Sequence, residues 1–151
     1  MKILSRVIIL FYIRVVKICY MIKLGQLKPG DIIMVNDEGL LREATVVHTN
    51  REEHMVLADN GIQEFWYQPQ DIHPIALDES QLLKFGFEKE LIEGAVKYKK
   101  GVFRLVIPQA GNFSDIEMWY REDRRHFNIP IAVHELQNLH ADMSKIPLER
   151  A

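Results

Sequence analysis

The sequence is poor in the features that reveal an enzyme or a cofactor site directly. It has a single cysteine, Cys19, among 151 residues, so no disulfide can form within the chain, and this suits a reducing cytosol. It contains no Gly-x-Ser-x-Gly elbow and no glycine-rich loop that opens a helix after a strand. We therefore expect no common nucleophilic hydrolase, no phosphate cradle and no cofactor, and we expect a cytoplasmic protein.

The chain also lacks an apolar run long enough to cross a membrane. The run at 7–13 has seven residues between Arg6 and Arg14, whereas a spanning helix needs about 20. Residues 1–20 contain four basic and no acidic residues, and the whole chain has a net charge of −2, so the remainder carries −6. The acidic body as a whole has no signature of polyanion binding.

We interpret residues 1–20 as a doubtful leader, upstream sequence ahead of a true start at Met21. Three alternatives stay open. The four basic residues share one helical face, which is typical of an amphipathic helix lying on a membrane surface. The other two alternatives are an extra helix or strand packed on the core, and an export signal, for which 18–21 is a poor cleavage site.

The segment 27–77 is predicted to be a small, strongly bent β-barrel. Pro29 and Gly30 punctuate the chain before a β-branched run, and Asn60-Gly61 between strand-like runs is a strong hairpin signal. A sheet this small must close or be covered to hide its edges. The predicted strands are 32–36, 42–49, 54–58, 62–67 and 72–76.

A joint between two β-rich halves follows. Asp78 can cap a helix, and Gly86 is placed to take the left-handed position that ends it. Phe87 then falls where it can touch Leu82 across the cap. The pattern predicts a joint helix at 78–85.

The second half is predicted to be a four-stranded antiparallel sheet at 95–131 with a helix at 132–143 packed on it. Apolar residues alternate along its strands, and Arg104 and Trp119 fall on the polar face. The predicted strands are 95–98, 102–107, 113–120 and 126–131, with a polar turn at 121–125. The fold class is thus α+β, and we expect the regions 21–77 and 78–151 to pack as one unit.

Two histidines on the closing helix invite a metal interpretation. The zinc-protease motif places its histidines at i and i+4, whereas His134 and His140 are six residues apart, about 120° around the helix axis. His140 falls at the edge of the apolar face and His134 points away from it. We interpret the helix as docked on the sheet by its leucines, without a metal.

Three aromatic residues and three arginines are the candidate binding residues. Aromatic side chains stack on bases and anchor protein interfaces, and a basic turn lies beside Trp119. The competing interpretations are that Trp66 and Tyr67 fill the barrel core and that the turn neutralises itself through its interleaved acids. The candidates are Trp66, Tyr67, Trp119, Arg121, Arg124 and Arg125.

The stretch 27–35, Leu-Lys-Pro-Gly-Asp-Ile-Ile-Met-Val, resembles the opening of many SH3-like barrels, in which a Pro-Gly-Asp turn leads into the first strand. The resemblance implies a five-stranded SH3-like barrel at 27–77. KOW-type members that bind RNA usually carry a further glycine-rich turn, and 42–47 has no such glycine pair.

The body is also similar to a group of small proteins from gut anaerobes, their phages and their mobile elements. The shared blocks are Ile72-x-Pro74-Ile75-x-Leu77, then 82–89, Leu-Leu-Lys-Phe-Gly-Phe-Glu-Lys, then 133–139, Val-His-Glu-Leu-Gln-Asn-Leu. The resemblance begins after Met21. It implies a phage- or element-linked setting, with no established activity and no functional residues to carry over.

Our leading hypothesis is a non-enzymatic adaptor that acts through protein–protein contacts. The second is a nucleic-acid-associated protein that uses Trp119 and the arginines, although an acidic body opposes phosphate binding. The third is a small metal-dependent hydrolase or nuclease built from scattered acidic residues.

Overall fold

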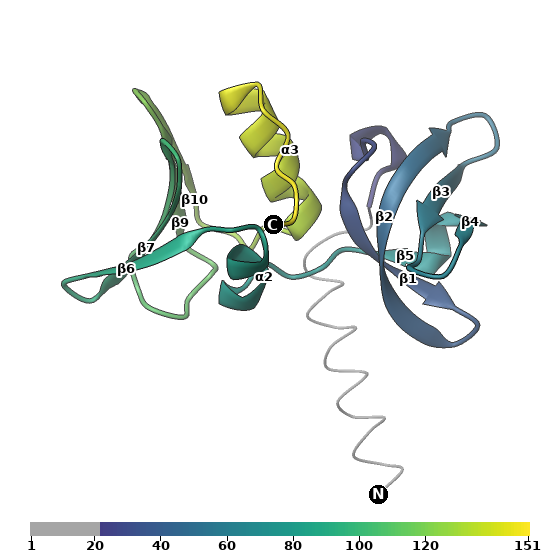
Figure 1. Ribbon diagram of the computed structural model, residues 1–151, viewed down its shortest axis with the longest axis horizontal. Helices are drawn as coiled ribbons and strands as arrows, with labels where there is room; N and C mark the ends of the chain where they lie inside the picture. Colours follow the sequence, from purple (N-terminus) through teal and green to yellow (C-terminus); the bar gives the residue numbers. More distant parts are fainter. Residues whose placement is uncertain (1–21) are drawn as a thin grey trace, which may run out of the picture. The chain divides into compact units, whose positions relative to one another are not determined.

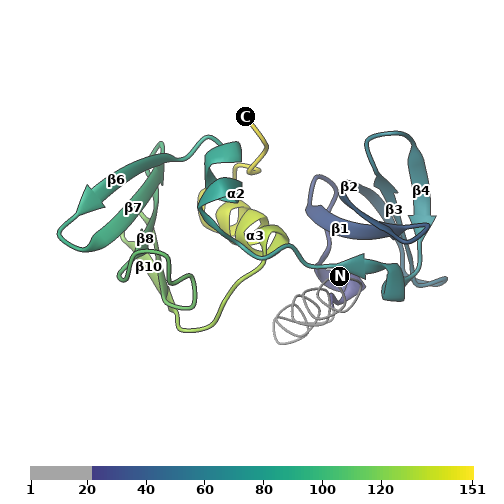
Figure 2. The same ribbon diagram turned by 90° about the horizontal axis from the view of Figure 1, so that it is seen from below.

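The computed structural model of the protein describes residues 22–151 (Figures 1 and 2). The alternatives for the leader at 1–20 lie outside the described residues. The chain divides into two compact units, the first ending at Ile75 and the second running from Ala76 to Ala151. The boundary predicted from the sequence lies two residues later, at 77/78.

The first unit is an antiparallel five-stranded sheet in the order β4-β3-β2-β1-β5. Its strands and 3-10 helices are η1 (Leu24–Gln26), β1 (Ile32–Asp37), β2 (Leu40–Asn50), β3 (Met55–Asp59), β4 (Glu64–Tyr67), η2 (Pro69–Asp71) and β5 (Ile72–His73). The sheet is open, because β4 and β5 are its two edges and do not pair with each other. Five antiparallel strands are thus confirmed, while the closed barrel is not found.

Alternation along the strands builds the core of the first unit. Each strand directs every second residue to one side, and most of those residues are apolar and buried. A bulge between Val46 and His48 bends the long strand β2, which helps the sheet to curl. The core residues are Ile22, Leu27, Ile33, Val35, Ala44, Val46, Val56, Ala58, Tyr67 and Ile72.

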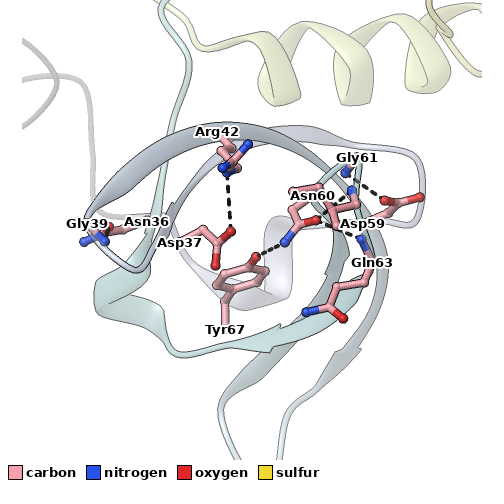
Figure 3. Close-up of polar contacts among 10 residues, drawn as sticks. Asn36, Asp37, Gly39, Arg42, Asp59, Asn60, Gly61, Gln63 and Tyr67 are labelled. Atoms are coloured by element: carbon pink, nitrogen blue, oxygen red, sulfur yellow. Dashed lines mark hydrogen bonds and ion pairs between the residues drawn. The ribbon is translucent and has the colours of Figure 1, made fainter.

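Polar side chains lie on the concave side of the curled sheet (Figure 3). Asn60 donates from Nδ2 to the hydroxyl of Tyr67 at 2.9 Å, and its Oδ1 accepts from the backbone N–H groups of Ile62 and Gln63. These bonds satisfy a buried amide and fix the loop between β3 and β4. Nearby, Nε of Arg42 lies 3.4 Å from Oδ2 of Asp37, an ion pair that is not aligned as a hydrogen bond.

The second unit is also an antiparallel five-stranded sheet, in the order β10-β9-β8-β7-β6. Two helices lie on the same side of this sheet (Figure 1), and the ring of Phe103 in β8 contacts both Phe87, just after α2, and His140 of α3. The elements are α2 (Glu79–Lys84), β6 (Glu88–Ile92), β7 (Ala95–Lys100), β8 (Phe103–Ile107), β9 (Ile116–Tyr120), β10 (Asp123–Phe127) and α3 (Val133–Ser144).

Two sequence predictions for the second sheet were wrong. The sheet has five strands rather than four, because the charged segment β6 pairs with β7 through the Glu93-Gly94 turn. All five residues of β6 are exposed. Its sequence therefore lacks the alternation of apolar and polar residues from which a half-buried strand is predicted. The polar turn is also shorter than predicted, since β10 begins at Asp123 and takes Arg124 and Arg125 into the sheet.

The joint forms as its sequence predicts. The side chain of Asp78 accepts from the backbone N–H of Gln81 at 2.8 Å and caps α2. Gly86 has φ +84°, and the backbone N–H groups of Gly86 and Phe87 donate to the carbonyls of Leu83 and Leu82, the Schellman pattern. Phe87 is buried, so the cap also contributes an aromatic ring to the core of the second unit.

Replacing Gly86 by valine is expected to destabilise the second unit. A side chain at φ +84° is strained by about 1–2 kcal/mol, and the new Cβ would lie 3.3 Å from Cβ of Ala151. The measurement is the midpoint of chemical unfolding. Gly25→Val is the control, because Gly25 has no positive φ and no atom lies within 4 Å of the place that a Cβ would take there. Equal stability of the Gly86→Val protein and the parent would contradict the cap.

Helix α3 closes the second unit, as predicted. Glu135 accepts from the backbone N–H of Ala132 at 2.9 Å and caps its first turn. The buried amide of Gln137 donates to the carbonyl of Leu148, so the C-terminal tail covers part of the helix. Within residues 22–151, no helix has the length and apolar character needed to span a membrane.

Candidate binding faces

The structure does not bring the six candidate residues into one site. Trp66 and Tyr67 belong to β4 in the first unit, whereas Trp119 and the three arginines belong to β9, β10 and their turn in the second unit. Each unit is therefore considered by itself.

Trp66 and Tyr67 are adjacent in β4 and point to opposite faces of the sheet. Tyr67 is 3% exposed and belongs to the core, whereas Trp66 is 38% exposed. The core interpretation therefore holds for Tyr67 and is wrong for Trp66, because neighbouring residues of a strand alternate in direction. Only Trp66 of this pair is available to a partner.

Trp66 belongs to an apolar row on the outer face of the first sheet. Leu57 in β3 is its partner in the register, and His48 in β2 is the partner of Leu57. The rings of His48 and Trp66 meet edge to face, with centroids 6.3 Å apart. We call Trp66, Leu57 and His48 the aromatic row. It presents an indole and an imidazole side by side on an exposed sheet.

The same outer face carries several acidic side chains. Glu64 and Asp59 are direct cross-strand partners, and Asp59 is in turn opposite Thr45. Glu43 lies two residues before Thr45 on β2 and is also exposed. Among the residues of the five strands, Arg42 is the single lysine or arginine, and it lies on the concave face beside Asp37 (Figure 3). Like charges directly opposite each other destabilise a sheet.

On the second sheet, Trp119 and Arg124 form a stacked pair. They are partners in the register of β9 and β10, and Cζ of Arg124 lies 3.7 Å from the centroid of the Trp119 ring. Nε1 of Trp119 also donates to Oε2 of Glu117 at 3.3 Å, which fixes the orientation of the ring. Such a cation–π contact is worth about 0.5–1 kcal/mol at an exposed site.

The other two arginines lie elsewhere. Arg121 is in the tight turn between β9 and β10, with φ +53°, and its Cζ is 5.4 Å from the centroid of the Tyr120 ring. Arg125 is the register partner of Met118, so it lies on the face opposite Trp119 and pairs with Asp123 at 3.2 Å. The predicted basic turn is therefore divided between a turn and two faces.

The structure adds two cations that the sequence analysis did not assign to the site. Arg104 in β8 is the register partner of Trp119, and Lys99 in β7 is the partner of Arg104. One row across four neighbouring strands therefore reads Lys99, Arg104, Trp119, Arg124, which we call the cationic row. Alternation had placed Arg104 on the polar face, but register between strands is needed to align these residues.

The histidines of α3 do not form a metal site. His134 is 2% exposed, contrary to the expectation that it points away from the core, and its Nδ1 has no hydrogen-bond partner among the described residues. Burial lowers its pKa from the ordinary 6.5 to about 4. Nδ1 of His140 instead meets the carbonyl of Ile146 at 2.9 Å. In residues 22–151, no group of three or more His, Cys, Asp or Glu side chains is arranged to hold a metal ion.

No protein-family model, no curated protein and no solved structure matches this chain. The aromatic row with its acidic surroundings and the cationic row are therefore the observations on which a function is proposed.

Proposed function

We propose that the protein is a non-enzymatic adaptor that binds a protein partner through the outer face of the first sheet. The observation that carries this proposal is the exposed aromatic row. Tryptophan is enriched among the residues that contribute most to protein interfaces, because a large ring loses little conformational freedom when it is buried. Trp66 and Leu57 lie together on one face, so a partner can bury both at once.

The charges beside the row indicate the chemistry of the partner. Residues 22–75 contain nine acidic and four basic residues, a net charge of −5. Glu64 and Asp59 are direct cross-strand partners of like charge, and Oδ1 of Asp59 also accepts from the backbone N–H of Gly61. A cationic side chain of the partner would therefore meet two carboxylate groups here. The partner is therefore a protein segment that presents lysine or arginine next to an apolar residue.

Three further features support the setting of this adaptor. The five antiparallel strands, with β5 returning to pair with β1, support the SH3-like interpretation of the first unit, although the sheet is open. The three sequence blocks shared with proteins of phages and mobile elements support an origin in such an element. The single cysteine supports a cytoplasmic location.

Selection from a random peptide library tests the proposal. Peptides retained by the parent protein, after depletion on the Trp66→Ala variant, should be enriched in lysine and arginine. Trp66→Ala should weaken their binding about tenfold or more, as expected for an interface anchor. Glu64→Gln with Asp59→Asn should weaken it several-fold.

Glu52→Gln with Glu53→Gln is the matched control, because it removes the same charge from the exposed turn between β2 and β3. The control should leave binding unchanged. If no peptide distinguishes the parent from Trp66→Ala, or if the selected peptides are acidic, the outer face of the first sheet is not the binding face.

A further inference from the structure

We propose that the cationic row of the second sheet binds single-stranded nucleic acid. This site is separate from the proposed protein-binding face, because it lies on the second unit and uses different residues. Its evidence is the alignment of Lys99, Arg104 and Arg124 with Trp119 across four strands, which the register establishes.

The row is compact enough to engage one short stretch of a polyanion. Neighbouring strands lie about 4.8 Å apart, so the three strand spacings from Lys99 to Arg124 cover about 14 Å. Three cations and one indole therefore lie within the length of a few nucleotides. Phosphate contacts of this kind supply most of the affinity of sequence-independent binding, and the charge must be concentrated locally.

Two cations of the row, Lys99 and Arg104, form no ion pair with another described residue, whereas basic residues in the adjacent row do. In the adjacent row, Lys97 pairs with Glu90 at 3.3 Å and His126 contacts Asp115. Within the described part of the chain, Lys99 and Arg104 have no acidic partner within ion-pair distance. Glu88 is the cross-strand neighbour of Lys99 on the edge strand β6, and Glu117 contacts Trp119, so the row keeps a net charge of +1 when both carboxylates are included.

The aromatic member of the row favours a nucleic acid over an acidic peptide. Bases stack on tryptophan and on guanidinium planes, and Trp119 and Arg124 already present these two planar groups in contact. Stacking is worth about 1–3 kcal/mol per base, which the carboxylate groups of an acidic peptide do not supply. Aromatic side chains on a sheet face are a common platform for unpaired bases, so the ligand that we infer is single-stranded.

Fluorescence of Trp119 provides a direct test. The chain has two tryptophans, so Trp66→Phe leaves Trp119 as the sole indole reporter. Titration with oligothymidine of about 12 nucleotides should quench this signal in a saturable way at low salt. The logarithm of the association constant should fall with the logarithm of salt concentration with a slope of about −2, because three cations each contribute about −0.7.

Variants locate the binding. Lys99→Gln with Arg104→Gln should reduce the slope to about −0.7 and weaken binding at least tenfold at low salt. Arg124→Lys should keep the slope but lose affinity, because lysine retains the charge without the planar stack. Lys23→Gln with Arg51→Gln is the matched control, since it removes two exposed cations from the first unit and should change neither quantity. Circular dichroism and thermal melting of every variant exclude unfolding as the cause.

Three results would overturn the proposal. The first is the absence of quenching at low salt in a folded protein. The second is an unchanged affinity and slope for Lys99→Gln with Arg104→Gln. The third is equally tight binding of oligoglutamate, which would show that the row recognises negative charge alone. None of these outcomes bears on the peptide-selection experiment, which uses the other unit.

Discussion

Phe87→Ala is expected to lower the free energy of unfolding by about 3–5 kcal/mol, the usual cost of removing a buried phenylalanine ring. Phe87 is 3% exposed and meets Phe103 edge to face, with ring centroids 6.2 Å apart. Phe103 in turn contacts His140 of α3, so the lost ring lies between the joint and the closing helix. A domain has about 5–15 kcal/mol of total stability, so this change removes a large part of it.

Chemical unfolding followed by Trp119 fluorescence in the Trp66→Phe background measures this effect in the second unit. Leu83→Ala is the control, because Leu83 precedes the cap but is 49% exposed. Its replacement should change the free energy of unfolding only slightly. A Phe87→Ala protein that unfolds at the parent midpoint would show that the joint is only a linker. In the reciprocal Trp119→Phe background, the fluorescence of Trp66 reports unfolding of the first unit. Equal midpoints for the two reporters would support the prediction that the two units unfold together.

Acidification from pH 7 to pH 4 is expected to cost about 3 kcal/mol of stability through His134 alone. Its pKa is about 4 in the folded protein and 6.5 in an unfolded chain, because burial opposes the charged imidazolium. The stability due to the neutral ring is complete above pH 6.5 and is lost as the pH falls towards 4. Burial also lowers the pKa values of His140 and His73, which adds to the same loss.

The contribution of His134 to this loss of stability can be checked by substitution. His134→Leu replaces the ring by an apolar side chain. The substitution breaks no hydrogen bond of Nδ1, because this atom has no partner among the described residues. The unfolding free energy of this variant should depend less on pH between 6.5 and 4, whereas exposed His54→Gln should behave as the parent. Burial raises the pKa of Glu135, which acts in the opposite direction and offsets part of the loss at the acid end. A parent-like pH profile in His134→Leu would contradict the assignment.

Turn chemistry and alternation were sufficient to predict much of the fold. The α+β class, the antiparallel sheets, the cap at Asp78, the left-handed Gly86 and the closing helix were all readable from local sequence. These features depend on residues close together in the chain, where steric and hydrogen-bonding preferences act directly. Sheet closure depends on the pairing of distant edges, and here β4 and β5 remain unpaired with each other.

The candidate sites were predicted less well, for two physical reasons. Sequence spacing gives the face of a residue within one strand but not its register against other strands, so Lys99 and Arg104 were not joined to Trp119. A helical wheel assumes one buried face, whereas α3 is covered on more than one side. His134 and Gln137 are both buried, and the C-terminal tail contributes the carbonyl that Gln137 needs.

The edge strands of the two open sheets differ in how they resist self-association. An edge strand exposes unpaired main-chain donors and acceptors, and a charged edge discourages pairing with another chain. The edge strand β6 carries Glu88, Lys89 and Glu90, while the edge strand β4 carries Phe65, which is 52% exposed, beside Trp66. The first unit is therefore the one whose edge favours strand addition, so the partner segment proposed for its outer face would continue the sheet as well as cover that face.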